Sequence, residues 1–304
     1  MSRLPYQAVI LAAGRGSRLG ERTAEAPKAL LPLGPRSLHD PSETCFLRRQ
    51  CEILHELGVG PIVVAVGYLK AQVADAVAGW GLPIQLVENT WPEIDESGSL
   101  HSFQYAARAE LGILDGRAQT LLMDGDIVYD RRVLSRLLDA PAETSLLVCS
   151  KHLGEDEEVL VYGTSGRPTM IGKGLTPELV RGAPCLGEAV GVVKFAPEDH
   201  ALVWTTMNWM LGDPDAPADS LKRRGFGPAR QATEHEELSQ RFMVYDKMSA
   251  VVFGAELPFM EVDGEAEYQL CREQFYPRLL QQEALIAGGR SVLAARSEQA
   301  GGVR

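Results

Sequence analysis

A glycine-rich loop that directly follows an apolar strand constrains this chain most. The apolar run Ala8–Ala12 leads into the loop, and residues 11–20 read LAAGRGSRLG. Glycines at positions 14, 16 and 20 allow backbone N–H groups to approach an anion closely, because no Cβ stands in the way. Arg15, Arg18 and the lysine of residues 27–34 (PKALLPLG) add positive charge. The pattern predicts a site for a nucleoside triphosphate after a buried strand.

Two other phosphate-binding loops do not fit this sequence. The dinucleotide-binding pattern G-x-G-x-x-G fails because the sixth residue counted from Gly14 is Leu19. The P-loop pattern requires a glycine followed by lysine and then serine or threonine, and the chain contains no such run.

Composition excludes several classes of partner. The chain has 304 residues, 45% of them hydrophobic, which suits one large domain or two small ones. Its net charge of −11 argues against nonspecific nucleic-acid binding and against an anionic membrane surface. We expect no membrane span, because no apolar run approaches the ~18 residues that a spanning helix needs. Five cysteines without a CxxC pair, and no signal peptide, predict reduced thiols in a cytoplasmic protein.

Strand-like and helical patterns alternate through the first half of the chain. This order predicts an α/β fold: a doubly wound, mostly parallel sheet with helices on both faces. The expected strands are Gln7–Ala12, Pro61–Val66, Ile84–Glu88, Thr120–Met123 and Ser145–Cys149, and the expected helices are Glu43–Leu57, Leu69–Ala78, Leu100–Glu110 and Arg131–Leu138. Ligands of such sheets bind beyond the carboxyl ends of the strands. We therefore expect Gly14–Gly20, Glu88–Ser99 and Asp124–Asp126 to meet at one cleft.

The second half is less regular. Its expected elements are strands at Val159–Tyr162 and Val190–Phe195, a helix at Glu198–Leu211, a helix opened by a capping box at Thr233–Glu236, and a long helix at Glu265–Leu280. Gly212–Pro228 reads as a loop that could serve as a lid. We expect one domain over residues 1–287, with a nucleotide-binding half at 7–150 and an acceptor-binding half at 151–287. Residues 288–304 read as a disordered tail.

The glycine loop and the Pro-Lys segment together resemble the signature of the nucleotidyltransferases that activate sugar 1-phosphates and related phosphoesters. That signature is L-A-A-G-x-G-x-R-[LM] followed by P-K-x-L-[LV]-P-[LV], and both halves occur here in order. Further similar segments are 67–68 (GY), 97–102 (SGSLHS), 124–127 (DGDI), 171–175 (IGKGL), 187–191 (GEAVG) and 261–264 (EVDG). The resemblance covers about residues 7–280 and is nearest to the cytidylyltransferases for phosphocholine, phosphonates and inositol phosphate. It implies a nucleotide-diphospho-sugar transferase-like fold with an inserted acceptor-binding region. The connection at Arg36–Thr44 is longer than the family pattern.

Nucleotidyl transfer brings two anions together, which magnesium and cationic side chains assist by positioning and charge neutralisation. The resemblance implies that Asp126 and Asp263 are the magnesium ligands, because they match the two metal motifs. Each aspartate could instead cap a turn or helix. Asp124 matches the motif less well. We expect it to lie beside the nucleotide and to support the metal ligands rather than to bind the metal directly.

Cationic side chains are expected to contact the phosphates. The resemblance implies that Arg18 and Lys28 bind the triphosphate and that Lys173 reaches the acceptor phosphate, although Lys173 could also be an ordinary turn lysine. The remaining nucleotide-binding residues that it implies are Leu11, Ala12, Ala13, Gly14, Arg15, Gly16 and Ser99. His101 lies in the same region and could contact the nucleotide, whereas we expect His235 to be a solvated helix residue.

The acceptor is the least constrained part of the interpretation. Glu188, between two glycines, is expected to face the cleft and bind a cation or hydroxyl group of the acceptor. Trp91 stands beside three acidic residues at 93, 95 and 96 and could hold a quaternary ammonium through its ring face, or it could be core packing. These features favour phosphocholine or a 2-substituted ethylphosphonate.

The preferred hypothesis is therefore a magnesium-dependent enzyme that joins CMP from CTP to a small phosphorylated or phosphonate acceptor and releases pyrophosphate. Two alternatives stay open: a sugar-1-phosphate uridylyl- or thymidylyltransferase, and a non-catalytic nucleotide-sensing subunit. CTP, or another nucleoside triphosphate, and the acceptor are the expected partners, with a homodimer possible and with neither nucleic acid nor membrane.

Overall fold

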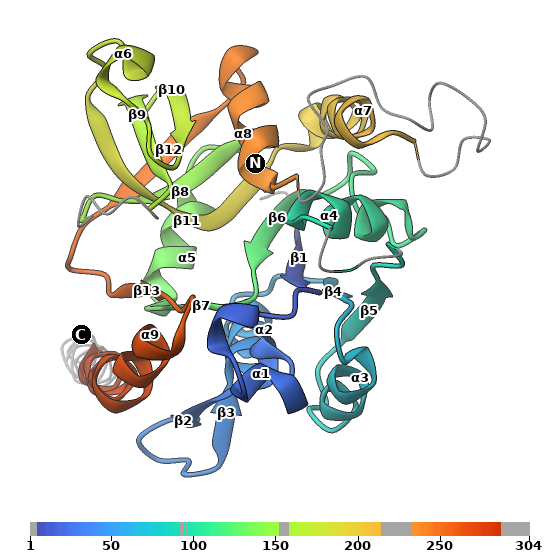
Figure 1. The fold of residues 1–304 in the computed structure, drawn as a ribbon, viewed down its shortest axis with the longest axis vertical. Coiled ribbons are helices and arrows are strands. Elements are labelled where there is room, and N and C mark those ends of the chain that lie inside the picture. The colour runs from blue at the N-terminus through green and yellow to red at the C-terminus, as the bar shows by residue number, and fades with distance from the viewer. Residues whose placement is uncertain (1–4, 92–93, 95–96, 152–157, 214–232, 287–304) are drawn as a thin grey trace, which may run out of the picture.

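The fold is a central sheet with helices on both sides (Figure 1). The computed structural model describes residues 5–91, 94, 97–151, 158–213 and 233–286. The strands of the sheet are β1 (Tyr6–Ala12), β4 (Ile62–Val66), β5 (Ile84–Glu88), β6 (Gln119–Asp124), β8 (Ser145–Cys149), β9 (Leu160–Thr164), β10 (Arg167–Gly172), β11 (Cys185–Phe195) and β12 (Ser249–Phe253). The helices that cover it are α2 (Phe46–Glu56), α3 (Lys70–Ala78), α4 (Ser99–Arg108), α5 (Arg131–Asp139), α7 (His200–Leu211) and α8 (His235–Val244).

The strand order is β10-β9-β11-β6-β1-β4-β5, with β8 paired to β11 and β12. Strands β6, β1, β4 and β5 run parallel to one another, and β12 is parallel to β8. The long strand β11 joins the four parallel strands to the rest of the sheet, because it runs antiparallel to β6, β8 and β9. The expected mostly parallel, doubly wound sheet of a nucleotide-diphospho-sugar transferase-like fold is confirmed.

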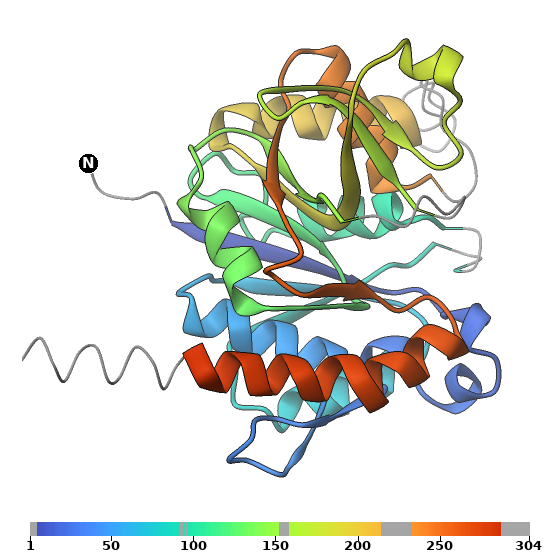
Figure 2. The same ribbon diagram turned by 90° about the vertical axis from the view of Figure 1, so that its left-hand side faces the viewer.

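Side chains of β1 alternate between two buried clusters on opposite faces of the sheet. Ala8, Ile10 and Ala12 pack with side chains of α2, α3 and α5, whereas Val9 packs with those of α4, α7 and α8. A nearly continuous run of apolar side chains, as at Ala8–Ala12, is typical of a strand that is covered on both faces. Figure 2 shows the two helical layers from the side.

The parallel strands end together, so the loops that follow them meet at one edge. Leu11 of β1 pairs in register with Asp124 of β6, and Ala12 pairs with Val66 of β4. A Cβ on Gly125 would lie 2.5 Å from the Leu11 carbonyl oxygen, and one on Gly67 would lie 2.8 Å from that of Ala13. The lack of a Cβ at these two positions thus permits a close approach of neighbouring backbones.

The long connection at Arg36–Thr44 belongs to a small hairpin. Strand β2 (Pro32–Pro35) pairs with β3 (Glu43–Cys45). The prediction that a helix begins at Glu43 is therefore wrong, because this residue pairs with Pro35 of β2 and α2 starts only at Phe46.

The C-terminal helix fixes the position of this hairpin. It begins as α9 (Glu265–Leu270), widens into a π-helical turn at Cys271–Phe275, and continues to residue 286 beside α2 (Figure 2). The Tyr268 hydroxyl donates to the Pro32 carbonyl at 2.8 Å, and the Tyr276 hydroxyl donates to the Pro35 carbonyl at 2.9 Å. The long helix predicted at Glu265–Leu280 is confirmed.

Helix α8 does not begin with the predicted capping box. Glu234 occupies the N-cap position, so Thr233 is one residue too early to cap the helix. The proposed lid at Gly212–Pro228 is described only at its first two residues, and the tail at 288–304 lies outside the described residues. Within the described part of the chain, no helix combines the length and the apolar character that a membrane crossing requires. The division into halves at residue 150 stays a prediction.

A buried ion pair joins the C-terminal helix to α2. Arg49 Nη2 lies 2.8 Å from Glu283 Oε1 and also donates to the Tyr129 carbonyl at 3.1 Å. Only 7% of the Arg49 side chain and 12% of the Glu283 side chain are exposed. The guanidinium therefore depends on these partners for its solvation.

We expect Glu283→Ala to destabilise the protein by ~3 kcal/mol, because it leaves the buried Arg49 charge without its carboxylate. The matched control is Glu265→Ala, on the same helix, which breaks an exposed pair with Arg22 and should cost less than ~1 kcal/mol. Urea denaturation followed by circular dichroism measures both. Equal losses for the two variants would contradict this account.

Candidate active site

Two cations and two carboxylates from distant parts of the sequence meet beyond the end of β6. Lys28 Nζ lies 2.6 Å from Asp126 Oδ2 and 3.4 Å from Asp263 Oδ1, and Arg18 Nη1 lies 2.8 Å from Asp263 Oδ2. These are the four residues that the sequence singled out for phosphate and magnesium. The structure brings all four together.

Local structure holds Lys28 against the glycine loop. It opens a short 3₁₀ turn, Lys28–Leu30, directly after Pro27. Gly16 has a φ of +68°, and a Cβ there would lie 3.0 Å from the Cβ and Cδ of Lys28. The lysine stem thus packs on a glycine whose backbone conformation disfavours other residues. Only 11% of the side chain is exposed, and although burial opposes the charge, the neighbouring Asp126 and Asp263 raise the pKa of Lys28.

Glu261 is a member of this site that the sequence interpretation missed. Its carboxylate and those of Asp126 and Asp263 offer oxygen atoms that all lie within 4.8 Å of one another. Strand β13 (Phe259–Glu261) pairs with β7 (Ile127–Tyr129), so that Glu261 is opposite Ile127. Glu261 and Asp263 stand two residues apart, which is the spacing that places extended residues on one side. That spacing was the available signal.

The three carboxylates fit a divalent cation. Burial and the nearby charges of Asp126, Asp124 and Asp263 raise the pKa of Glu261 well above its usual range, and Lys28 offsets this only in part. Repulsion among the three carboxylates therefore disfavours the ionised form of Glu261, and a bound divalent cation would relieve that repulsion. Oxygen-only carboxylate ligands are those that Mg²⁺ prefers. Asp126 and Asp263 would hold the ion, with Glu261 beside them.

A second charged cluster lies behind the first. His235 Nε2 lies 3.1 Å from Asp124 Oδ2 and 3.7 Å from Glu236 Oε1. The prediction that His235 is solvated is wrong: the residue is 4% exposed, because the first turn of α8 faces the sheet. Burial alone would lower its pKa, but Glu236, Asp124 and Glu234 raise it to about 10.

The Asp124 carboxylate occupies space that is open because residue 191 is a glycine. Burial raises its pKa to about 6, against the opposing effect of His235. Gly191 of β11 has a φ of +65°, and a Cβ there would lie 2.1 Å from Asp124 Oδ2. The sequence grouped Asp124 with the nucleotide; the structure commits its carboxylate to α8.

The glycine loop presents its tip to solvent. Leu11 is half-buried, Ala12 and Ala13 are buried, and Gly14 and Arg15 are exposed. The Ala13 carbonyl accepts the Tyr68 amide at 2.9 Å, and the Arg15 guanidinium lies 5.3 Å from the Tyr68 ring centre. The nucleotide contacts assigned to this loop stay predictions.

Ser99 of the 97–102 segment makes hydrogen bonds to α8, and His101 of the same segment packs on Trp91. The Ser99 hydroxyl accepts the His235 amide at 2.8 Å, and the Ser99 amide donates to Glu234 at 2.8 Å. Trp91 packs on His101 with ring centres 4.3 Å apart, and burial lowers the pKa of His101 to about 4. Residues 93, 95 and 96, which the sequence grouped with Trp91, lie outside the described residues.

The two remaining predicted residues lie on other elements. Lys173 is exposed in the turn after β10, beside Gly174 with a φ of +57°. Glu188 is half-buried in β11, opposite Cys149 of β8 and Leu160 of β9. Their roles toward an acceptor stay predictions.

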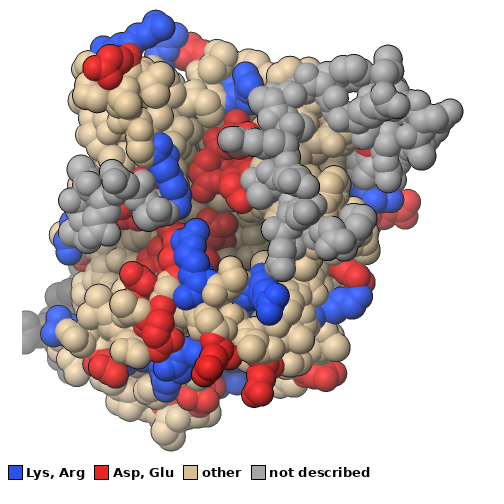
Figure 3. All heavy atoms as spheres, viewed as in Figure 1, with Lys and Arg blue, Asp and Glu red and all other residues tan. Residues whose placement is uncertain are grey.

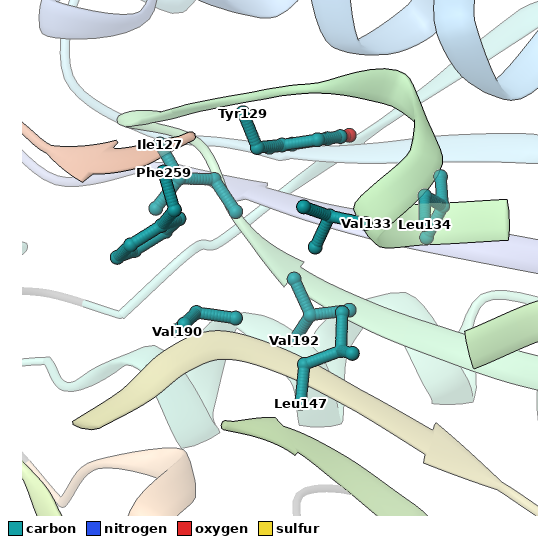
Figure 4. Close-up of a pocket in the computed structure, with 8 residues that line it drawn as sticks. All are labelled: Ile127, Tyr129, Val133, Leu134, Leu147, Val190, Val192 and Phe259. Atoms are coloured by element: carbon teal, nitrogen blue, oxygen red, sulfur yellow. The ribbon is translucent and has the colours of Figure 1, made fainter. Parts of the chain in front are cut away.

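The space-filling view shows acidic side chains inside a hollow on one face, with Lys and Arg side chains beside them (Figure 3). A separate, narrow apolar pocket lies next to β7 (Figure 4), and its lining consists of Ile127, Tyr129, Val133, Leu134, Leu147, Val190, Val192 and Phe259. These side chains carry no charge, so the pocket offers nothing to a phosphate. The charged cluster is the candidate active site.

The protein-family model that describes the MobA-like NTP transferase domain matches residues 8–179, which is more than half of the chain. The chain belongs to the MobA-like NTP transferase family. This membership confirms the resemblance drawn from the glycine loop and the Pro-Lys segment.

Curated relatives of this MobA-like NTP transferase carry names of cytidylyl-transferring enzymes. The chain is 34% identical over 152 residues to CMP-5'-(3-aminopropyl)phosphonate synthase of Streptomyces rubellomurinus, covering 49% of this chain and 22% of that protein. It is 25% identical over 141 residues to CTP:phosphoglutamine cytidylyltransferase of Campylobacter jejuni, covering 46% and 51% respectively. The chain thus spans about half or less of the length of these relatives.

Solved structures agree on the fold. The inositol-1-phosphate CTP transferase from T. maritima superposes with a TM-score of 0.61 at 17% identity, over 89% of this chain and 96% of that one. CTP:phosphocholine cytidylyltransferase from Streptococcus pneumoniae gives a TM-score of 0.61 at 18% identity, over 89% and 99%.

Replacing Glu261 with Gln should stabilise this MobA-like NTP transferase when divalent cations are removed. Because the pKa of Glu261 is raised in the folded state, its contribution to stability falls as the pH rises above the ordinary value of 4.5 toward that raised pKa. We expect Glu261→Gln to be more stable than the wild type by about 1 kcal/mol at pH 8, and nearly equal to it at about pH 4, where the wild-type group is protonated in both states.

Urea denaturation in EDTA at the two pH values measures this difference. The control is Glu273→Gln, which removes the same charge from an exposed position of the C-terminal helix and should leave stability nearly unchanged. A Glu261→Gln variant that is less stable than the wild type at pH 8 would show that the carboxylate is not under repulsion.

Proposed function

We propose that this protein is a magnesium-dependent nucleotidyltransferase that joins CMP from CTP to a small phosphorylated or phosphonate acceptor and releases pyrophosphate. One observation carries the proposal: Lys28 and Arg18 stand at the end of the glycine loop, in ion pairs with Asp126 and Asp263. Cations for a triphosphate and carboxylates for its metal are thus within a few ångströms of each other. The names of the relatives support CTP as the donor.

The reaction is a displacement at the α-phosphorus of CTP. An oxygen of the acceptor phosphate or phosphonate forms a new bond to phosphorus, the bond to the bridging oxygen of the β-phosphate breaks, and pyrophosphate leaves with that electron pair. The acceptor oxygen is already ionised at neutral pH, so no side chain has to remove a proton. The chemistry depends on bringing the two anions together.

The chain's own residues perform this task by charge and position. Lys28, fixed by its packing on Gly16, and the Arg18 guanidinium, with its planar set of donors, bind triphosphate oxygens. Asp126 and Asp263, with Glu261 beside them, would hold Mg²⁺, which supplies positive charge at the phosphates when it is bound. Lys173 binds the acceptor phosphate from the β10 turn.

We propose phosphocholine or a 2-substituted ethylphosphonate as the acceptor, and we favour one with an anionic and a cationic end, such as phosphocholine or 2-aminoethylphosphonate. Two observations support it. Glu188, half-buried in β11, offers a carboxylate apart from the proposed magnesium ligands, which favours a cation. The relative at 34% identity is named for an aminopropylphosphonate, and such a molecule has the same two ends.

A pyrophosphate-release assay tests the proposal. CTP, UTP, dTTP and GTP are each offered, with magnesium or with EDTA, to phosphocholine, 2-aminoethylphosphonate, 2-hydroxyethylphosphonate and glucose 1-phosphate. We expect turnover with CTP, magnesium and a cationic acceptor. Preference for glucose 1-phosphate with UTP or dTTP would identify a sugar-nucleotide enzyme instead. Nucleotide binding without pyrophosphate release from any pair would identify a sensing subunit.

Lys28→Met should lower kcat/KM by roughly 10²–10³-fold, the loss that follows removal of one preorganised donor from developing charge. Methionine keeps an unbranched stem against Gly16, so the fold should stay intact. The control is Lys70→Met, which removes an exposed lysine paired with Glu88 and should leave turnover within about twofold. A folded Lys28→Met variant that loses less than about tenfold, or ~1.4 kcal/mol, would place Lys28 outside the phosphate site.

A further inference from the structure

The first turn of α8 is tied to the nucleotide half of the molecule by side chain and backbone. The His235 side chain pairs with Asp124, at the end of β6, over 3.1 Å. Its amide donates to the Ser99 hydroxyl, and the Ser99 amide donates to Glu234. The first turns of α4 and α8 thus satisfy each other's unpaired amide groups, which helix starts always present.

The middle of α8 is bonded to strand β10, in the second half of the chain. Gln240 Oε1 accepts the Ile171 amide of β10 at 3.0 Å, and Gln240 Nε2 donates to the Thr169 carbonyl at 3.2 Å. Figure 1 shows α8 between the β9–β10 hairpin and α4, and the helix packs on both. Gln240 follows His235 by five residues, a rise of about 7.5 Å along one rigid helix. Lys173 follows Ile171 by two residues.

We propose that His235 is a positioning residue that, through α8 and Gln240, sets where the turn of Lys173 lies relative to the Asp124–Asp126 turn. The inference rests on the proposed function, in which Lys173 binds the acceptor phosphate and Asp126 serves the nucleotide side. One helix then aligns the two reacting molecules, and a small tilt of that helix misplaces the acceptor while the nucleotide loop stays in place.

The connection from Asp124 through His235 to α8 is rigid. Asp124 is fixed in the sheet by its pairing with Leu11 and beside Gly191 by close contact. His235 is buried, so its ion pair is shielded from solvent, and losing one partner of such a pair is costly. Removing the imidazole leaves intact the hydrogen bond from the amide of residue 235 to the Ser99 hydroxyl, because the donor belongs to the main chain. The substitution therefore changes mainly the position of α8 relative to β6.

The test compares His235→Ala and Gln240→Ala, which break opposite ends of the same tie. His200→Ala is the matched control: His200 is also buried, but it contacts Thr120 and Gly116 at the other end of β6. Hydrogen exchange of peptides that span residues 167–174 is measured on the ligand-free protein. We expect exchange at least tenfold faster in both tie variants than in the wild type, and unchanged exchange in the control.

Steady-state kinetics provides the second readout. We expect both tie variants to raise the KM for the acceptor at least tenfold and to leave the KM for CTP within about threefold. A purely structural role would raise both KM values or neither. His235→Gln, which keeps a donor toward Asp124, should recover most of the exchange protection. If His235→Ala fails to fold, Gln240→Ala carries the comparison, because it breaks the other end of the same tie.

Two results would overturn the inference: unchanged exchange at 167–174 in the tie variants, or an equal rise in the His200 control. Equal rises in the KM for CTP and for the acceptor would also overturn it. Failure of the proposed function is distinguishable, because the wild type would then show no turnover while the exchange measurement still decides whether α8 ties the two turns.

Discussion

The structure depends on a balance of charge at one point beyond β6. Three carboxylates from two segments, Asp126, Glu261 and Asp263, face the cations of two others, Arg18 and Lys28. Separately, each group would cost free energy to bury. Together they hold the glycine loop, the Pro-Lys turn and the β7–β13 pair in contact. The same charges that tie these segments are the ones a triphosphate and its metal would engage, so binding and local stability draw on one set of interactions.

Much of this arrangement follows from local sequence. The apolar run before the glycine loop predicts β1, and the apolar periodicity of 145–149 predicts β8 with its observed bounds. Register then requires the ends of β1 and β6 to meet, so the glycine loop and the Asp124–Asp126 turn come together once the sheet is parallel. Asp263 was recognisable by its motif. These features are local patterns or direct consequences of a parallel sheet.

The features that sequence reasoning missed are set by tertiary packing. Glu261 becomes part of the site only because β13 pairs with β7, and a three-residue ladder leaves only its two-residue spacing from Asp263 as a signal. His235 looks like a surface residue because its neighbours are glutamates, yet α8 turns this position toward Asp124. Glu43 has no strand signal, and its pairing with β2 depends on a hairpin that Tyr276 anchors from the far end of the chain.

The position of those anchoring tyrosines has a consequence for the order of assembly. Asp263, Tyr268 and Tyr276 all lie in the last part of the chain, yet they bind residues near its beginning: Arg18, Pro32 and Pro35. Contacts between segments this distant in sequence form slowly, because a long loop must close first. During synthesis from the N-terminus, the first strands of the sheet emerge with the glycine loop and β2 still lacking their final support. The charged centre is therefore completed late, when the C-terminal helix docks, and a chain stopped before that helix would present a sheet with an unfinished site.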